Sequence, residues 1–183
     1  MKKLDIYLQN VRISKAEKYI TKGSNVLDIG TNDGIMFEKL SHLIASGIGI
    51  EPTTINEVNK EKYKIIPGYF PDALINENTP LFDVITMLAV LEHVPTEEQK
   101  KLGENCAKYL KKGGIVIITV PSPQVDIILD VLGKLKLIEG MQLHEHYGFK
   151  PSDTEKIFAN NFKLVCKKTF QLGLNNLFVF EKI

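Results

Sequence analysis

The sequence NVLDIGTNDG, residues 25–34, decides the fold, because it joins an apolar stretch to two glycines four positions apart. The residues before Gly30 are typical of a buried strand, and a strand that turns directly into a helix needs glycine at the tight turn. A dinucleotide-binding turn would carry Gly-x-Gly-x-x-Gly, so that a pyrophosphate can approach the backbone. Here Asp28 precedes Gly30 and Gly34, and its carboxylate would repel a pyrophosphate. The turn therefore predicts a ligand with a cationic centre.

A second acidic residue, Glu51, stands seventeen positions after Gly34, in the stretch GIGIEP. At the end of a parallel strand, its carboxylate can accept hydrogen bonds from both hydroxyls of a ribose, and it would repel a 2′-phosphate. Together, the two stretches predict an adenosine-type ligand without phosphates.

Apolar and β-branched runs of strand length recur along the chain, and segments with helical spacing separate the first five of them. The clearest helix covers residues 97–111, and a Ser-x-x-Glu capping box that begins at Ser152 marks another. This alternation predicts a doubly wound α/β fold with a seven-stranded sheet, mostly parallel and ending in an antiparallel C-terminal hairpin. The seven runs are NVLDIG, GIGIE, YKII, FDVITML, GIVIITV, FKLVCKKTF and NNLFVFEKI.

Composition and charge argue against several classes of protein. The 183 residues predict a single domain over residues 1–183. The formal net charge is +1 and the lysine pairs are scattered, which disfavours a nucleic-acid partner. No run approaches the roughly 18 apolar residues of a membrane span, and the N-terminus has no signal-peptide core, so we expect a cytoplasmic protein. Cys106 and Cys166 form no Cys-x-x-Cys pair and are interpreted as apolar packing residues.

The chain resembles the class I S-adenosylmethionine-dependent methyltransferases in four stretches, which follow one another in the order typical of that family. They are VLDIGTNDG, GIGIEP, PLFDVITMLAVLEHVP and LKKGGIVIITVPSP. The resemblance extends from about Arg12 to the C-terminus. It implies a Rossmann-like fold, S-adenosyl-L-methionine as the cofactor, and methyl transfer to a small-molecule acceptor, at an oxygen atom.

The same resemblance implies where the cofactor binds. Glu51 would hold the ribose, Asp72 in GYFPDAL would face the adenine amino group, and Leu88 would lend backbone atoms to the methionine end. Many relatives carry a further glycine or small residue where this chain has Thr-Asn-Asp at residues 31–33, which leaves the openness of the loop in question. The methionine part would be surrounded by Asp28, Gly30, Thr31, Asn32 and Gly34.

Histidines are the candidates for a catalytic base, which the reaction needs only when the acceptor loses a proton during attack. His93 follows the fourth strand, at the edge of the sheet where ligands bind, and ordering of that loop is the alternative role. His146, with Tyr147 and Phe149, resembles the segment that lines the acceptor pocket in relatives acting on small molecules. Together with His144 it would supply only part of a zinc site, so no metal is predicted.

Residues 121–150 form an insertion that is longer than an ordinary connection, and we interpret it as a lid or a wall of the acceptor pocket. Packing against the domain and a dimer surface are the alternatives, so a homodimer stays open. Two further functions also stay open. A regulatory protein would bind the cofactor without turnover, and a methyltransferase for protein or RNA would need an added recognition region or a basic face, which the sequence does not contain.

Overall fold

The computed structural model describes residues 3–75, 77, 80–122 and 149–183. A single eight-stranded sheet, in the order β3-β4-β2-β1-β5-β6-β8-β7, forms its centre. The five strands from β4 to β6 run parallel, and β8 is antiparallel to both β6 and β7. The strands are β1 (Ser24–Ile29), β2 (Ile44–Glu51), β3 (Val58–Asn59), β4 (Tyr63–Pro67), β5 (Phe82–Leu88), β6 (Leu110–Pro121), β7 (Phe162–Phe170) and β8 (Asn175–Lys182).

This topology confirms the doubly wound fold and the antiparallel C-terminal hairpin. The predicted number of seven strands is wrong by one, because the two-residue strand β3 pairs with the edge of β4. A strand so short leaves no alternating apolar pattern that sequence reasoning could detect. Most of the predicted insertion, residues 123–148, lies outside the described residues.

Four α-helices and two short 3₁₀ helices accompany the sheet in the described residues. Helix α3 (Thr96–Tyr109) confirms the helix predicted for residues 97–111. The prediction of a helix between every pair of the first strands is wrong for the connection from β2 to β4, which contains β3 instead. Ile55 in this connection is 89% exposed, so the segment buries no helical apolar face. The other helices are α1 (Lys3–Glu17), α2 (Ile35–Lys39), η1 (Asp72–Leu74), η2 (Leu91–His93) and α5 (Asp153–Phe158).

The predicted capping box at the start of α5 does not form. Ser152 already has helical backbone angles, φ −63° and ψ −22°, and its side chain makes no capping hydrogen bond. A capping serine needs an extended backbone to place its hydroxyl against the first free N–H groups of the helix. The Ser-x-x-Glu pattern therefore predicted the position of the helix correctly, but the serine does not accept a hydrogen bond from the free N–H groups of its first turn.

The two faces of the sheet carry separate apolar cores, as expected for strands that are buried on both sides. Helices α1 and α2 cover one face, where Phe37 and Ile65 are buried, and α3 and α5 cover the other, where Cys106 and Phe158 are buried. Neighbouring residues of one strand contribute to opposite cores, as Ile117 and Ile118 of β6 do. The burial predicted for Cys106 is confirmed, and burial raises the pKa of its thiol.

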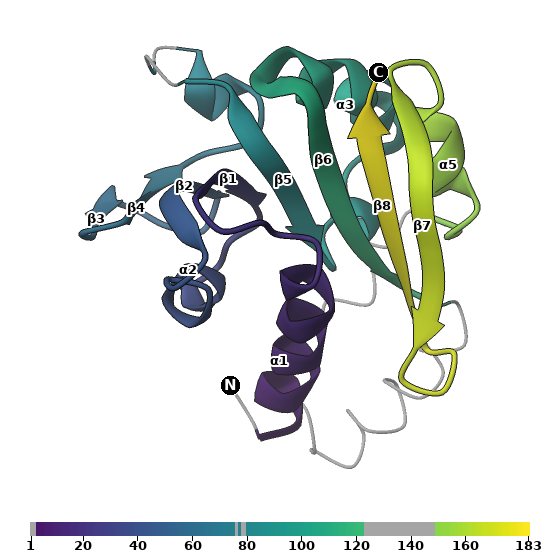
Figure 1. Cartoon of the computed structure of the whole chain (residues 1–183), viewed down its shortest axis with the longest axis horizontal. Coiled ribbons are helices and arrows are strands. Elements are labelled where there is room, and N and C mark those ends of the chain that lie inside the picture. The colour runs from purple at the N-terminus through teal and green to yellow at the C-terminus, as the bar shows by residue number, and fades with distance from the viewer. Residues whose placement is uncertain (1–2, 76, 78–79, 123–148) are drawn as a thin grey trace.

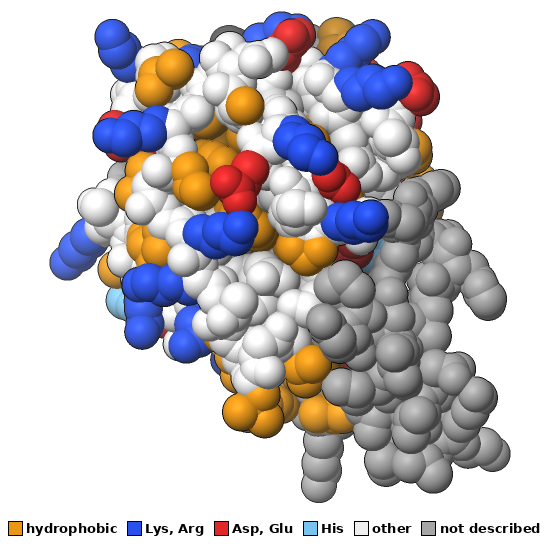
Figure 2. Space-filling view, turned by 90° about the vertical axis from the view of Figure 1, so that its right-hand side faces the viewer, with side chains coloured by type: hydrophobic (Ala, Val, Ile, Leu, Met, Phe, Trp, Pro, Cys, Tyr) orange, Lys and Arg blue, Asp and Glu red, His pale blue; other side chains and the backbone are white. Residues whose placement is uncertain are grey.

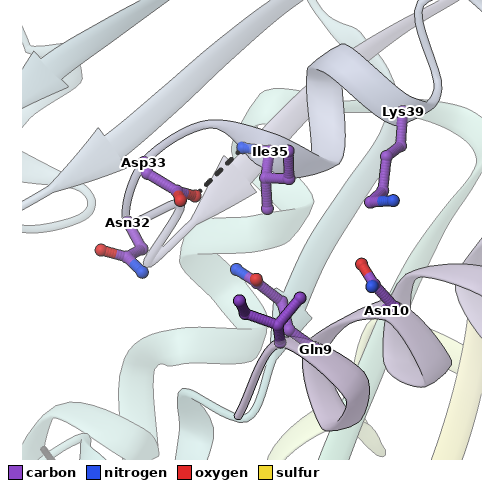
Figure 3. Close-up of a pocket in the computed structure, with 7 residues that line it drawn as sticks. Gln9, Asn10, Asn32, Asp33, Ile35 and Lys39 are labelled. Atoms are coloured by element: carbon purple, nitrogen blue, oxygen red, sulfur yellow. Dashed lines mark hydrogen bonds between the residues drawn. The ribbon is translucent and has the colours of Figure 1, made fainter. Parts of the chain in front are cut away.

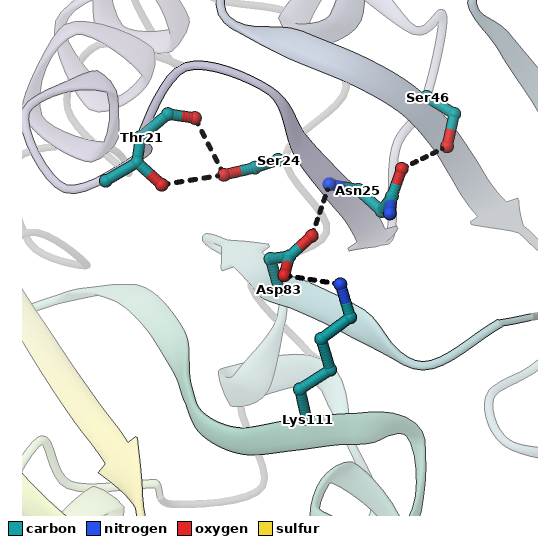
Figure 4. A network of polar contacts seen from close by, with 6 residues as sticks. All are labelled: Thr21, Ser24, Asn25, Ser46, Asp83 and Lys111. Carbon is teal, nitrogen blue, oxygen red and sulfur yellow. Dashed lines mark hydrogen bonds and ion pairs between the residues drawn. The ribbon is translucent and has the colours of Figure 1, made fainter.

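The amino ends of the parallel strands are held together by a polar network (Figure 4). Asp83 of β5 accepts hydrogen bonds from the backbone N–H of Asn25 in β1, at 2.8 Å, and from the Lys111 ammonium of β6, at 2.7 Å. Ser46 of β2 donates to the side-chain oxygen of Asn25 at 2.8 Å. Partial burial raises the pKa of Asp83, but these hydrogen bonds and the charge of Lys111 outweigh it, so the pKa is lowered overall. The network fixes this edge of the sheet and leaves the opposite, carboxyl edge for ligands.

In Figure 1 the carboxyl ends of β5 and β6 point downward, toward the part of the molecule that holds the turn of the β7–β8 hairpin and the N-terminal end of α1. Strand β7 closes the sheet on one side, and Figure 2 shows lysine and acidic side chains interspersed on the face that this side presents. Lys163, Lys167 and Lys168 are exposed on β7, and charged side chains on an edge strand oppose pairing with other sheets. No described helix is both long enough and apolar enough to cross a membrane.

Candidate functional site

The turn between β1 and α2 alternates between ordinary and left-handed backbone. Gly30, Asn32 and Gly34 have φ angles of 73°, 52° and 77°. Asparagine is among the few residues other than glycine that tolerate this conformation, because its short polar side chain finds local partners. Asn32 therefore adopts the backbone conformation for which a glycine would otherwise be needed.

Both glycines of the turn are also required by packing. A Cβ atom on Gly30 would lie 2.5 Å from Cγ2 of Val90, and one on Gly34 would lie 2.9 Å from Cε2 of Tyr63. Thr31 between them is buried against Gly49 of β2, where an added Cβ would lie 2.5 Å from its Cγ2. The turn is thus fitted closely to its neighbours on β2, β4 and the segment after β5.

Asp28 lies in β1 just before this turn and is only 4% exposed. The hydroxyl of Thr86 on β5 donates to its Oδ1 at 2.6 Å. Burial raises the pKa of Asp28 to about 6; the hydrogen bond from Thr86 opposes this shift and the charge of Glu51 adds to it. A carboxylate with this environment strongly favours a neighbouring positive charge, since burial weakens screening by water.

Glu51 ends β2 beside the same turn and is 8% exposed. Its Oε2 accepts the backbone N–H of Asn32 at 2.9 Å, and its Oε1 accepts both the N–H and the hydroxyl of Thr53, at 3.1 and 2.6 Å. A carboxylate offers about four lone-pair positions, so these three bonds orient the group and leave it about one position for a ligand. A ligand that needs both oxygens would replace one of these internal bonds.

Two other residues are predicted to bind the cofactor, and one of them, Leu88, lies at the same carboxyl edge. Leu88 is the last residue of β5 and is half-buried against the core on the α1 side. Asp72 is exposed at the first residue of η1, in the connection that follows β4. The structure therefore brings Asp28, the turn, Glu51 and Leu88 to one edge, with Asp72 in a loop that leaves that edge.

Of the two predicted catalytic histidines, only His93 lies in the described part of the chain. His93 ends η2, directly after β5, and its side chain is exposed; its backbone N–H donates to the carbonyl of Val90 at 2.9 Å. This position at the carboxyl edge is the one expected for a group that reaches a ligand. His146 lies outside the described residues, and Phe149 packs against the core on the α3 side.

Three residues that the sequence reasoning missed also lie at this edge. Val90 covers Gly30, and Ala89 before it has a left-handed φ of 62° that redirects the chain after β5. Arg12 on α1 is half-buried, and its Nε atom is fully buried without a hydrogen-bond partner in the described part of the chain. Burial lowers the pKa of Arg12, while the charges of Glu92 and Asp5 raise it.

A signal for Arg12 was present in the composition. It is the only arginine among the 23 basic residues of lysine and arginine. Arginine is more weakly hydrated than lysine, and its planar group matches the two oxygens of a carboxylate. A single arginine in a lysine-rich chain therefore indicates a position where lysine would not serve, such as a partly buried carboxylate-binding site.

Comparison with known proteins agrees with this geometry. Residues 7–162 match a family model described as a methyltransferase domain. The ubiquinone biosynthesis O-methyltransferase of Shewanella sp. (strain ANA-3) is 26% identical over 166 residues, covering 85% of this chain and 69% of the relative. The enzyme of the same name from Coxiella burnetii (strain Dugway 5J108-111) is 31% identical over 111 residues, which cover 57% of this chain and 47% of the relative.

Solved structures show the same fold. The N-methyltransferase NodS from Bradyrhizobium japonicum WM9 superimposes with a TM-score of 0.66 at 15% identity, covering 96% of both chains. The same protein in complex with S-adenosyl-L-homocysteine gives a TM-score of 0.61 at 16% identity, covering 96% of this chain and 87% of the other. Identities this low establish the architecture, and the chemistry has to be argued from this chain's own residues.

Proposed function

This chain belongs to the class I S-adenosylmethionine-dependent methyltransferases, and we propose that it transfers the methyl group to an oxygen atom of a small molecule. The observation that carries the proposal is the juxtaposition of Asp28, the left-handed turn and Glu51 at the carboxyl edge of the sheet. The names of the two relatives from Shewanella and Coxiella support oxygen as the acceptor atom. The cytoplasmic location remains a prediction, and a homodimer stays open.

The residues at this edge fit S-adenosylmethionine. The buried Nε of Arg12 has no hydrogen-bond partner among the described residues, and the cofactor brings a carboxylate that accepts such a bond. Glu51 retains a lone-pair position for a ribose hydroxyl, and the buried Asp28 favours a ligand that carries positive charge. Asp72 and Leu88 remain the proposed contacts to the adenine and to the methionine end.

The chemistry assigned to the protein follows from this arrangement. When bound, S-adenosylmethionine would supply a methyl group activated by a positively charged sulfur; that methyl group would pass to the acceptor oxygen as its bond to the sulfur breaks. The protein contributes alignment, because displacement requires the attacking atom, the methyl group and the sulfur to lie in line. We propose that His93 accepts the proton of a hydroxyl acceptor, because it is exposed after β5 and an imidazole can act as a general base.

The proposed function is tested by supplying S-adenosylmethionine with hydroxylated and amino compounds and measuring S-adenosylhomocysteine and methylated product by mass spectrometry. We expect turnover only with hydroxylated compounds. Calorimetric titration with S-adenosylhomocysteine is run in parallel. Binding without turnover on any compound would favour a regulatory protein that binds the cofactor. Methylation confined to protein or RNA from a lysate would favour a methyltransferase for those macromolecules.

His93→Ala is expected to lower kcat/KM for methyl transfer by about 10²–10⁴-fold, the usual contribution of a positioned general base. The affinity for S-adenosylhomocysteine should stay within about twofold of wild type, since the histidine acts on the acceptor side. His42→Ala is the matched control, because His42 is also exposed and pairs only with Glu17, at 3.4 Å, among the described residues. Equal turnover in both variants would assign His93 to ordering the loop.

A further inference from the structure

A pocket of about 530 Å³ opens between α1 and the turn that follows β1, beside the proposed cofactor site (Figure 3). Helix α1 supplies one wall, and the turn with the start and end of α2 supplies the other. Apart from Asn32, which is predicted to lie beside the methionine part of the cofactor, these side chains have no role in the methyl transfer described above. The lining residues are Ile6, Gln9, Asn10, Asn32, Asp33, Ile35 and Lys39.

The pocket combines carboxamides with aliphatic side chains in its lining, and the charges at its rim are balanced. Gln9 and Asn10 of α1 are half-buried, and the side-chain oxygen of Asn10 is fully buried without a hydrogen-bond partner in the described residues. A buried acceptor of this kind calls for a donor from a ligand or from water. Asn32, Asp33 and Lys39 are exposed around it and carry one negative and one positive charge, so the rim favours neither anions nor cations.

We infer that this pocket binds the neutral, hydroxyl-rich part of the methyl acceptor, a sugar or a similar polyol, and this inference rests on the proposed function. Carboxamides both donate and accept hydrogen bonds, as hydroxyl groups do, and three of them line the pocket. The aliphatic side chains of Ile6 and Ile35 offer surface for the C–H faces of a sugar ring. The volume lies within the range of small-molecule sites.

An acceptor dominated by an apolar tail matches only the aliphatic part of this lining. Seating such a tail would remove water from the carboxamides of Gln9 and Asn32 without replacing their hydrogen bonds, and it would leave the buried oxygen of Asn10 without a donor. An unpaired buried polar group costs about 1–3 kcal/mol, so an apolar occupant would bind poorly here. The pocket thus favours a polyol over an acceptor with an apolar tail.

The pocket is coupled to the cofactor site through Asn32. The side chain of Asn32 lines the pocket, while its backbone N–H donates to Glu51, the proposed ribose ligand. Asp33, on the same wall, accepts the backbone N–H of Ile35 at 3.2 Å, which fixes the turn at the start of α2. A polyol in the pocket would therefore lie beside the loop that holds the cofactor.

The test uses ligand-observed saturation-transfer NMR on the full chain with bound S-adenosylhomocysteine. The probes are methyl α-D-glucoside as a neutral polyol, and 4-hexylcatechol as an acceptor with an apolar tail. Gln9→Leu and Asn10→Leu remove the carboxamides, and Ser14→Leu, at an exposed position of the same helix, is the matched control. We expect the glucoside signal in wild type and in the control, and at least a fivefold weaker signal in the two pocket variants.

Two outcomes would overturn the inference: no glucoside signal with wild type while the catechol binds, or equal glucoside signals in all variants. Calorimetry with S-adenosylhomocysteine on the same samples reports the folding of each variant and the cofactor site independently. Glucoside bound in the pocket, with the cofactor product bound and no methyl transfer to any hydroxyl, would refute the proposed function while supporting the ligand class of the pocket.

Discussion

Glu51→Ala is expected to lower the affinity for S-adenosylhomocysteine by about a hundredfold, as measured by calorimetric titration. A hydrogen bond to a charged group contributes roughly 1.5–3 kcal/mol, and a hundredfold change corresponds to about 2.8 kcal/mol. The substitution also removes the acceptor for the backbone N–H of Asn32, so the turn loses the bond that ties it to β2. Both effects weaken the binding of the cofactor.

A second substitution separates these two contributions. Glu51→Gln keeps an oxygen that can accept the N–H of Asn32 but removes the negative charge, so we expect a loss of about tenfold. Glu57→Ala is the control, since Glu57 is an exposed acid in the connection that follows β2. Affinity unchanged by both Glu51 substitutions would refute the assignment of the ribose to Glu51.

The strands could be predicted because their burial on both faces leaves continuous apolar runs in the sequence. FDVITML coincides with the observed bounds of β5. FKLVCKKTF coincides with those of the edge strand β7, which is mostly exposed, so its β-branched and aromatic residues indicated that strand and not burial on both faces. The prediction of a helix in the connection from β2 to β4 was wrong. We expected helical spacing between all of the first strands, but this connection has few apolar residues with which a helix could cover the sheet. The short strand β3 depends on pairing with β4, which is a tertiary effect and not a local one.

The glycines of the candidate site could be predicted because a tight turn restricts the backbone to conformations that few residues adopt. What holds the turn could not be predicted, since Val90 and Tyr63 approach it from distant parts of the sequence. The question raised by Thr-Asn-Asp is answered by Asn32, which combines a left-handed backbone with a hydrogen bond to Glu51. That bond joins residues 19 positions apart and leaves no pattern in either stretch.

Asp28→Asn is expected to make the protein more stable at pH 8 while weakening cofactor binding. Burial raises the pKa of Asp28 to about 6, so the folded state disfavours its charged form. The unfolded chain binds fewer protons than the folded chain between pH 4 and 6, and stability therefore falls as the pH rises through this window. Above it the full cost is present, at most about 3 kcal/mol for a shift of about two units. Asparagine is uncharged and still accepts the hydrogen bond from Thr86.

Urea denaturation at pH 5 and pH 8 measures this difference directly. The stability gained by Asp28→Asn should be larger at pH 8 than at pH 5, because part of the wild-type carboxyl is protonated in the folded state at the lower pH. Asp72→Asn serves as the control, since Asp72 is exposed and its substitution should shift stability little at either pH. A gain that is independent of pH would show that the charge of Asp28 is not what the fold disfavours. Together with a lower affinity for S-adenosylhomocysteine, the expected result means that the buried carboxylate is kept for the positively charged cofactor at the expense of stability.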